Sequence, residues 1–188
     1  MLLRRRSVGA PHAMEQGKVP MPEFNDGLVT DMDAATQRAR AQAIASIAHR
    51  GQVDKLGAAY FDHPARVADQ FDWDAQPLEH CAAWLHDVVE DSDITEQGLL
   101  NAGVLPAIVE AVGLLTRTDD VPDALYYERI SRHPIARAVK LADIADNTAE
   151  WRTRGLDHDT RARLSQKYAT AREYLLAGGS AAADSQVI

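Results

Sequence analysis

The chain has 188 residues, of which 46% are hydrophobic and 26% are charged, and its formal net charge is −8. These proportions predict one globular domain with enough apolar material for a core. The acidic charge argues against nonspecific binding to nucleic acid or to an anionic membrane surface, and no apolar run approaches the roughly 18 residues needed to cross a bilayer.

Cys81 is the only cysteine in the sequence. An internal disulfide is therefore excluded, and nothing in the cysteine content indicates an oxidising compartment. We expect a cytoplasmic enzyme or binding module, in which Cys81 packs in the core.

The two ends of the chain differ from its middle. Residues 1–31 mix proline, glycine and charge without an apolar period and lack the apolar stretch of a secretory signal, so we expect a mobile N-terminal arm. Residues 178–188 are expected to form a C-terminal tail. A single domain over residues 32–177 is predicted between them.

Helical periodicity runs through this domain, and no convincing strand alternation interrupts it. The sequence predicts an all-α bundle of seven or eight helices. The expected helices cover residues 33–51, 62–71, 77–91, 95–103, 106–117, 122–131, 134–151 and 157–178. Asp62 and Thr95 are candidate N-caps, and Gly103 and Gly178 are candidate helix ends.

The segment "AAWLHDVVEDSD" (residues 82–93) places ionisable groups directly after an apolar run. On a continuous helix His86 and Asp87 would diverge by about 100°, so both could reach one ion only with help from other helices. Glu90 would project toward the same cavity. A divalent cation explains this crowding, because it offsets the repulsion between carboxylates.

Two further candidate ligands lie elsewhere in the sequence. His63 begins an amphipathic segment, and Asp143 lies within an apolar stripe, where a carboxylate requires a partner. Two imidazoles and two carboxylates suit manganese, iron, zinc or cobalt better than calcium or magnesium.

The series His63, His86-Asp87, Asp143 resembles the H…HD…D motif of the HD-domain metal-dependent phosphohydrolases. The blocks "AHRGQVDKLGAAYFDHPARVA", "AAWLHDVVEDSD" and "AVKLADIADN" resemble, more narrowly, the hydrolase domain of the RelA/SpoT family and its small single-domain relatives. That family removes the 3′-diphosphate from guanosine tetra- and pentaphosphate. The resemblance covers about residues 40–150.

The resemblance implies a role for each matching residue. Four would bind the metal, usually manganese: His63, His86, Asp87 and Asp143. Glu90 and Asp91 match the acidic pair that positions and activates the attacking water. Lys55, Tyr60 and Asn147 match substrate-contacting or site-lining positions, and Lys140 is a further cation that could offset phosphate charge.

One position departs from the family pattern. Asp54 stands before Lys55 where the family commonly has arginine, so a cation expected beside the nucleobase is replaced by an anion. This change leaves the metal chemistry intact but weakens the prediction of guanine recognition.

The predicted function is metal-dependent hydrolysis of a nucleotide phosphoester, most similar to guanosine-3′,5′-bis(diphosphate) 3′-diphosphohydrolase activity. The alternatives are a phosphatase acting on another nucleotide and a nucleotide-sensing module without turnover. The expected partner is a small-molecule nucleotide, with no nucleic acid or membrane, and the sequence does not decide the oligomeric state.

Several of these residues also have a structural explanation. Asp143 could pair with Lys140, and Tyr60 could serve in packing. Glu90 and Asp91 could be the solvated end of a helix, although acids at a helix C-terminus oppose the macrodipole. Tyr126 and Tyr127 could line the site or belong to a plain connection.

Overall fold

The computed structural model describes residues 26–54 and 57–183, with side chains described over 34–54 and 57–177. Within these ranges the chain is helical and contains no strand; one isolated antiparallel bridge joins Val53 to Ala59. The predicted all-α class is therefore confirmed. The helices are α1 (Asp26–Ala48), α2 (Asp62–Ala68), α3 (Pro77–Leu85), α4 (Val88–Asp91), α5 (Glu96–Asn101), α6 (Pro106–Leu115), α7 (Asp123–Ser131), α8 (Pro134–Asn147), α9 (Glu150–Thr153) and α10 (His158–Ala183).

The described part of the chain holds ten helices instead of seven or eight, because two expected helices are each divided. The segment 77–91 forms α3 and α4, and the segment 134–151 continues into a separate short helix, α9. No glycine or proline lies at either break. The interruptions therefore depend on tertiary packing and not on a local breaker residue.

Two helices extend beyond the ranges expected from the sequence. Helix α1 begins at Asp26, within the predicted arm, and the rest of that arm (residues 1–25) lies outside the described residues. Helix α10 continues through Gly178 to Ala183, because the alanines at 181–183 favour the helix.

Local signals explain several helix starts. The Thr95 side chain accepts a hydrogen bond from the Gly98 amide at 3.1 Å, which confirms the predicted N-cap of α5. Gly103 ends that segment with φ of +81°, a conformation that glycine adopts without strain. The Asp62 prediction is wrong, because Phe61 occupies the N-cap position and Asp62 already lies within α2.

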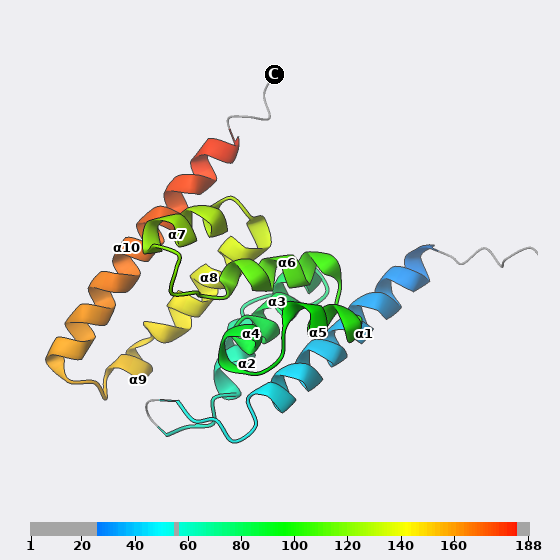
Figure 1. Cartoon of the computed structure of the whole chain (residues 1–188), viewed down its shortest axis with the longest axis horizontal. Coiled ribbons are helices and arrows are strands. Elements are labelled where there is room, and N and C mark those ends of the chain that lie inside the picture. Colours follow the sequence, from blue (N-terminus) through cyan, green and yellow to red (C-terminus); the bar gives the residue numbers. More distant parts are fainter. Residues whose placement is uncertain (1–25, 55–56, 184–188) are drawn as a thin grey trace, which may run out of the picture.

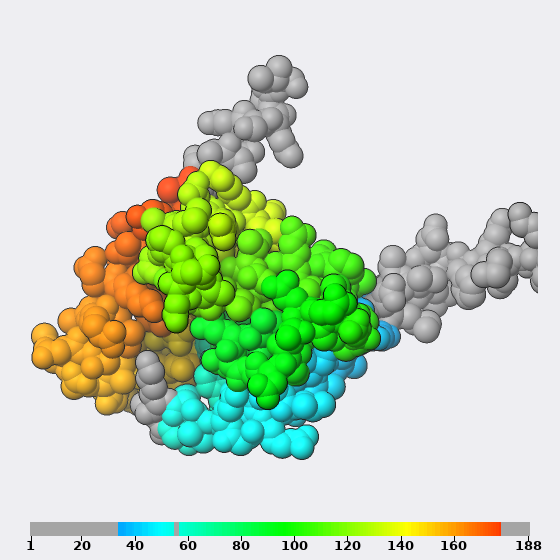
Figure 2. Space-filling view, in the orientation of Figure 1, coloured from blue at the N-terminus to red at the C-terminus, as the bar shows by residue number. Residues whose placement is uncertain are grey.

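Helix α3 lies at the centre of the bundle, and its residues from His80 to Leu85 are all buried. It packs against α1, α2, α6 and α8, while α7 and α10 pack against each other and against α8 (Figure 1). In the space-filling view, α10 (orange to red) runs along the left side with α7 next to it, and the residues that follow α1 (cyan) lie along the bottom (Figure 2). No helix in the described ranges has the length and apolarity to cross a membrane.

Candidate active site

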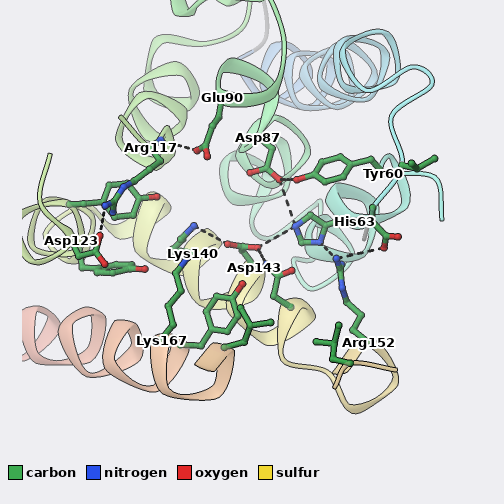
Figure 3. A pocket seen from close by; sticks show the side chains of 18 residues that line it. Tyr60, His63, Asp87, Glu90, Arg117, Asp123, Lys140, Asp143, Arg152 and Lys167 are labelled. Atoms are coloured by element: carbon green, nitrogen blue, oxygen red, sulfur yellow. Dashed lines mark hydrogen bonds and ion pairs between the residues drawn. The ribbon is translucent and has the colours of Figure 1, made fainter. Parts of the chain in front are cut away.

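The four predicted metal ligands come from three parts of the bundle and lie close together; Figure 3 shows three of them, His63, Asp87 and Asp143. His63 is the second residue of α2, and Asp143 lies in α8. His86 and Asp87 form the turn between α3 and α4 instead of lying on one continuous helix. The expected divergence of about 100° is therefore wrong. Because the two residues form a turn, their side chains approach each other.

Short distances join the four side chains. The Nε2 atom of His63 lies 3.7 Å from Asp87 Oδ2 and 3.2 Å from Asp143 Oδ1. The Nε2 atom of His86 lies 3.0 Å from Asp87 Oδ2 and 3.9 Å from Asp143 Oδ1. His63, His86 and Asp87 each offer a ligand atom within 4.8 Å of the other two. The geometry therefore permits one cation to be shared by these groups.

Outer contacts fix which nitrogen of each histidine faces the centre. Nδ1 of His86 lies 2.7 Å from the Ala83 carbonyl, and Nδ1 of His63 lies 2.7 Å from Asp146 Oδ2. Both partners are acceptors, so Nδ1 carries a proton and Nε2 faces the centre, where it offers its lone pair to a cation once its own proton has been displaced. Nε2 of His86 is buried and has no hydrogen-bond partner. A buried nitrogen without a partner, aimed at two carboxylates, is suited to a metal ion.

The electrostatics of the centre agree with its geometry. In the metal-free protein, burial alone would lower the pKa of His86, but the charge of Asp87 raises that pKa to about 9. Burial would raise the pKa of Asp87, whereas the charge of His86 lowers it to about 2. Carboxylates held ionised in a buried place attract positive charge, which a cation site requires.

Asp143 has two sets of partners. Its Oδ2 atom pairs with Lys140 Nζ at 2.9 Å, while Oδ1 faces the histidines and accepts a hydrogen bond from Asn147 Nδ2 at 2.5 Å. Pairing with Lys140 and a place beside the histidines are thus compatible. Lys140 and Asn147 both line the pocket in front of the cluster.

This pocket has a volume of about 550 Å³. Glu90 lines it and accepts a hydrogen bond from the Arg117 main-chain amide at 2.8 Å, and burial raises the pKa of its carboxyl. Asp91 is exposed and does not line the pocket; its carbonyl accepts a hydrogen bond from Gln52. The predicted acidic pair is therefore divided between the pocket and the surface.

Tyr60 lines the same pocket and donates its hydroxyl to Asp87 Oδ2 at 2.5 Å. Burial and the charges of Asp87 and Asp91 raise the pKa of this phenol, which stays protonated. Tyr60 thereby orients a predicted ligand in addition to forming part of the wall. Lys55, predicted to contact substrate, lies outside the described residues.

Asp54 has a cationic neighbour that the sequence did not reveal. Its Oδ2 atom lies 3.8 Å from Arg152 Nη2, and both side chains line the pocket. Arg152 comes from α9, about a hundred residues further along the chain. The anion that replaces the family's arginine is thus accompanied by an arginine from another element.

Other site residues were missed by sequence reasoning. Asp146 accepts from His63, from Arg66 and from Arg152, and its position three residues after Asp143 in "ADIADN" could have indicated it. Tyr126 and Tyr127 do line the pocket, together with Arg117 and Lys167. No local motif distinguishes Arg117 or Lys167, because only tertiary packing brings the α6–α7 connection and α10 to the pocket.

Comparisons with known proteins agree with the expected resemblance, although no protein-family model matches the chain. The chain is 30% identical over 136 residues to the guanosine-3′,5′-bis(diphosphate) 3′-pyrophosphohydrolase of Vibrio cholerae, an alignment covering 66% of this chain and 19% of that protein. It is 38% identical over 52 residues to a probable guanosine-3′,5′-bis(diphosphate) 3′-pyrophosphohydrolase of Mycoplasma genitalium, covering 27% of this chain and 7% of that protein. The chain therefore spans a minor part of these curated relatives.

A solved structure of a metazoan ortholog of SpoT that hydrolyzes ppGpp aligns with a TM-score of 0.60 at 22% identity. The alignment covers 76% of this chain and 84% of the other. This likeness shows a shared fold. Together with the two sequence relatives, it confirms the resemblance to the hydrolase domain of the RelA/SpoT family.

Proposed function

We propose that this chain is a metal-dependent hydrolase that removes the diphosphate from the 3′ position of guanosine-3′,5′-bis(diphosphate). The observation that carries this proposal is the convergence of two imidazole Nε2 atoms and two carboxylates, with Nε2 of His86 buried and otherwise unpartnered. The names of the sequence relatives supply the substrate.

The metal would be held by His63, His86, Asp87 and Asp143, with Mn²⁺ as the expected ion and Fe²⁺, Co²⁺ or Zn²⁺ as alternatives. When bound, it supplies a lowered pKa for a coordinated water and charge stabilisation for the phosphoryl oxygens. Asp146 and the Ala83 carbonyl hold the imidazoles in the orientation this requires.

Glu90 is the proposed general base. It lines the pocket, the Arg117 amide fixes one carboxylate oxygen, and burial raises its pKa toward the range in which a carboxylate accepts a proton efficiently. Asp91, which lies outside the pocket, would act indirectly, through its charge on Tyr60, whose hydroxyl orients Asp87. Glu90 would take a proton from the water, whose oxygen attacks the phosphorus attached to the 3′ oxygen; the bond between them breaks, the 3′ oxygen receives a proton to become a hydroxyl, and diphosphate leaves.

Substrate binding would involve Lys55, Tyr60, Lys140 and Asn147. The last three line the pocket together with Asp54 and Arg152. Lys140 would offset phosphate charge on the side of Asp143.

Diphosphate release from guanosine-3′,5′-bis(diphosphate) in the presence of Mn²⁺ tests this function. We expect turnover by the unmodified chain and its loss in His86→Ala and Asp87→Ala, with loss of bound metal in both. Asp93→Ala, which removes an exposed acid of the same segment, is the matched control. Release of phosphate only from other nucleotides would favour the alternative phosphatase, and binding without any release would favour a sensing module.

A further inference from the structure

Lys167 of α10 is a pocket-lining cation that the hydrolytic mechanism does not use. Its side chain extends from α10 into the pocket, on the side of Lys140 (Figure 3). It makes no ion pair with any carboxylate of the described residues, and its ammonium lies 5.8 Å from the centre of the Tyr168 ring. A lysine in such a position keeps its charge available for a ligand.

The other cations of the described pocket are already paired. Lys140 binds Asp143, and Arg117 forms an ion pair with Asp123. Arg152 binds Asp146 at 2.7 Å and approaches Asp54. Lys167 differs from these three cations because no carboxylate of the described residues forms an ion pair with it.

The charge of the pocket is also distributed unevenly. Asp87 and Glu90, from the α3–α4 turn and α4, lie on one side, whereas Lys167 extends from α10 (Figure 3). A volume of about 550 Å³ exceeds what a single phosphate group fills and matches a small-molecule site. A nucleotide that places one phosphorylated position at the metal ligands would have room to place a second phosphorylated position near α10.

We propose that Lys167 binds the phosphate group that is not cleaved, so that the site prefers nucleotides phosphorylated at two positions. This inference rests on the proposed function for the identity of the cleaved arm. An ammonium group beside a phosphate forms a charge-assisted contact, and it acts on ground state and transition state alike because it lies away from the breaking bond. Lys167 is therefore a specificity-determining residue for binding.

Kinetics on two substrates test the inference. Guanosine-3′,5′-bis(diphosphate) carries both arms, and guanosine 3′-diphosphate carries only the arm to be cleaved. With Lys167→Met we expect kcat/KM on the first substrate to fall about 10- to 100-fold through KM, and kcat/KM on the second to change less than twofold. Lys167→Arg should restore most of the loss, and Arg172→Met, on the exposed surface of α10, should behave as the unmodified chain.

Binding measurements separate this inference from the proposed hydrolysis. Calorimetric titration with Mn²⁺ present, in a Glu90→Gln background with and without Lys167→Met, gives the affinity for both nucleotides without turnover. A selective loss of affinity for the doubly phosphorylated nucleotide supports the subsite even if the unmodified chain releases no diphosphate. Equal effects on both nucleotides, no effect on either, or no measurable binding overturns it, whatever the outcome of the turnover assay.

Discussion

At the scale of single residues, the outer partners of the histidines account for the shape of the centre. Asp146 receives hydrogen bonds at 2.7 Å from His63 Nδ1 and from Arg152 Nη1, and at 2.8 Å from Arg66 Nε. Burial alone would raise the pKa of Asp146, but its hydrogen bonds with His63 and Arg66 lower that pKa well below its usual range. One carboxylate thus orients a predicted ligand and joins α2 to α8 and α9.

Replacing Asp146 by asparagine tests this positioning role. The asparagine side chain keeps the shape of Asp146 but lacks the negative charge that accepts hydrogen bonds from His63, Arg66 and Arg152. His63 should therefore lose its fixed orientation. We expect affinity for Mn²⁺ to fall about 10- to 100-fold, measured by calorimetric titration. Asp62→Asn, an exposed acid beside His63, is the control and should bind Mn²⁺ as before. An unchanged affinity for Mn²⁺ in Asp146→Asn would contradict the role of Asp146 in positioning His63.

At the scale of elements, the sequence predicted the helices better than it predicted their interruptions. Amphipathic periodicity and the Thr95 cap are local, and they located most of the helices correctly. The break at His86-Asp87 depends on how α3 packs among α1, α2, α6 and α8, which no local residue pattern encodes. The same reasoning explains the site: the motif residues were found, but Arg152 and Lys167 were not, because distant helices deliver them.

Helix α3 should be sensitive to changes in its packing. Leu85 is fully buried and directly precedes His86. Leu85→Ala should lower the free energy of unfolding by about 2–5 kcal/mol through the cavity it leaves. Leu176→Ala, at a residue 63% exposed on α10, should change it by less than about 0.5 kcal/mol. Urea denaturation of both variants measures this difference, and equal midpoints would contradict the central place of α3.

At the scale of the whole molecule, the clustered charges make the stability of the metal-free protein depend on pH. The pKa of Asp87 is lowered to about 2, so its contribution is complete above the unfolded value of about 3.9 and is lost as the pH falls toward 2. The pKa of His86 is raised to about 9, so its contribution is complete below about 6.5 and is lost as the pH rises toward 9.

Stability in the presence of a chelator should therefore be greatest between about pH 4 and pH 6.5 and decline on both sides. Urea midpoints measured from pH 3 to pH 9 test this expectation. The Asp87→Asn variant should show a weaker decline on the acidic side, because it lacks the titrating carboxylate. A flat profile between pH 6.5 and pH 9 would contradict the assigned contact between His86 and Asp87.

The last helix of the bundle has a consequence for how the chain responds to its ligand. The predicted metal ligands end at Asp143, whereas Lys167 and Tyr168 reach the pocket from α10, which is held in place mainly by α7 and α8. Nucleotide occupancy and the docking of α10 are then linked equilibria, so each must favour the other to the same extent. Saturation with nucleotide should accordingly slow amide hydrogen exchange along the C-terminal helix, far from the atoms that bind the cation.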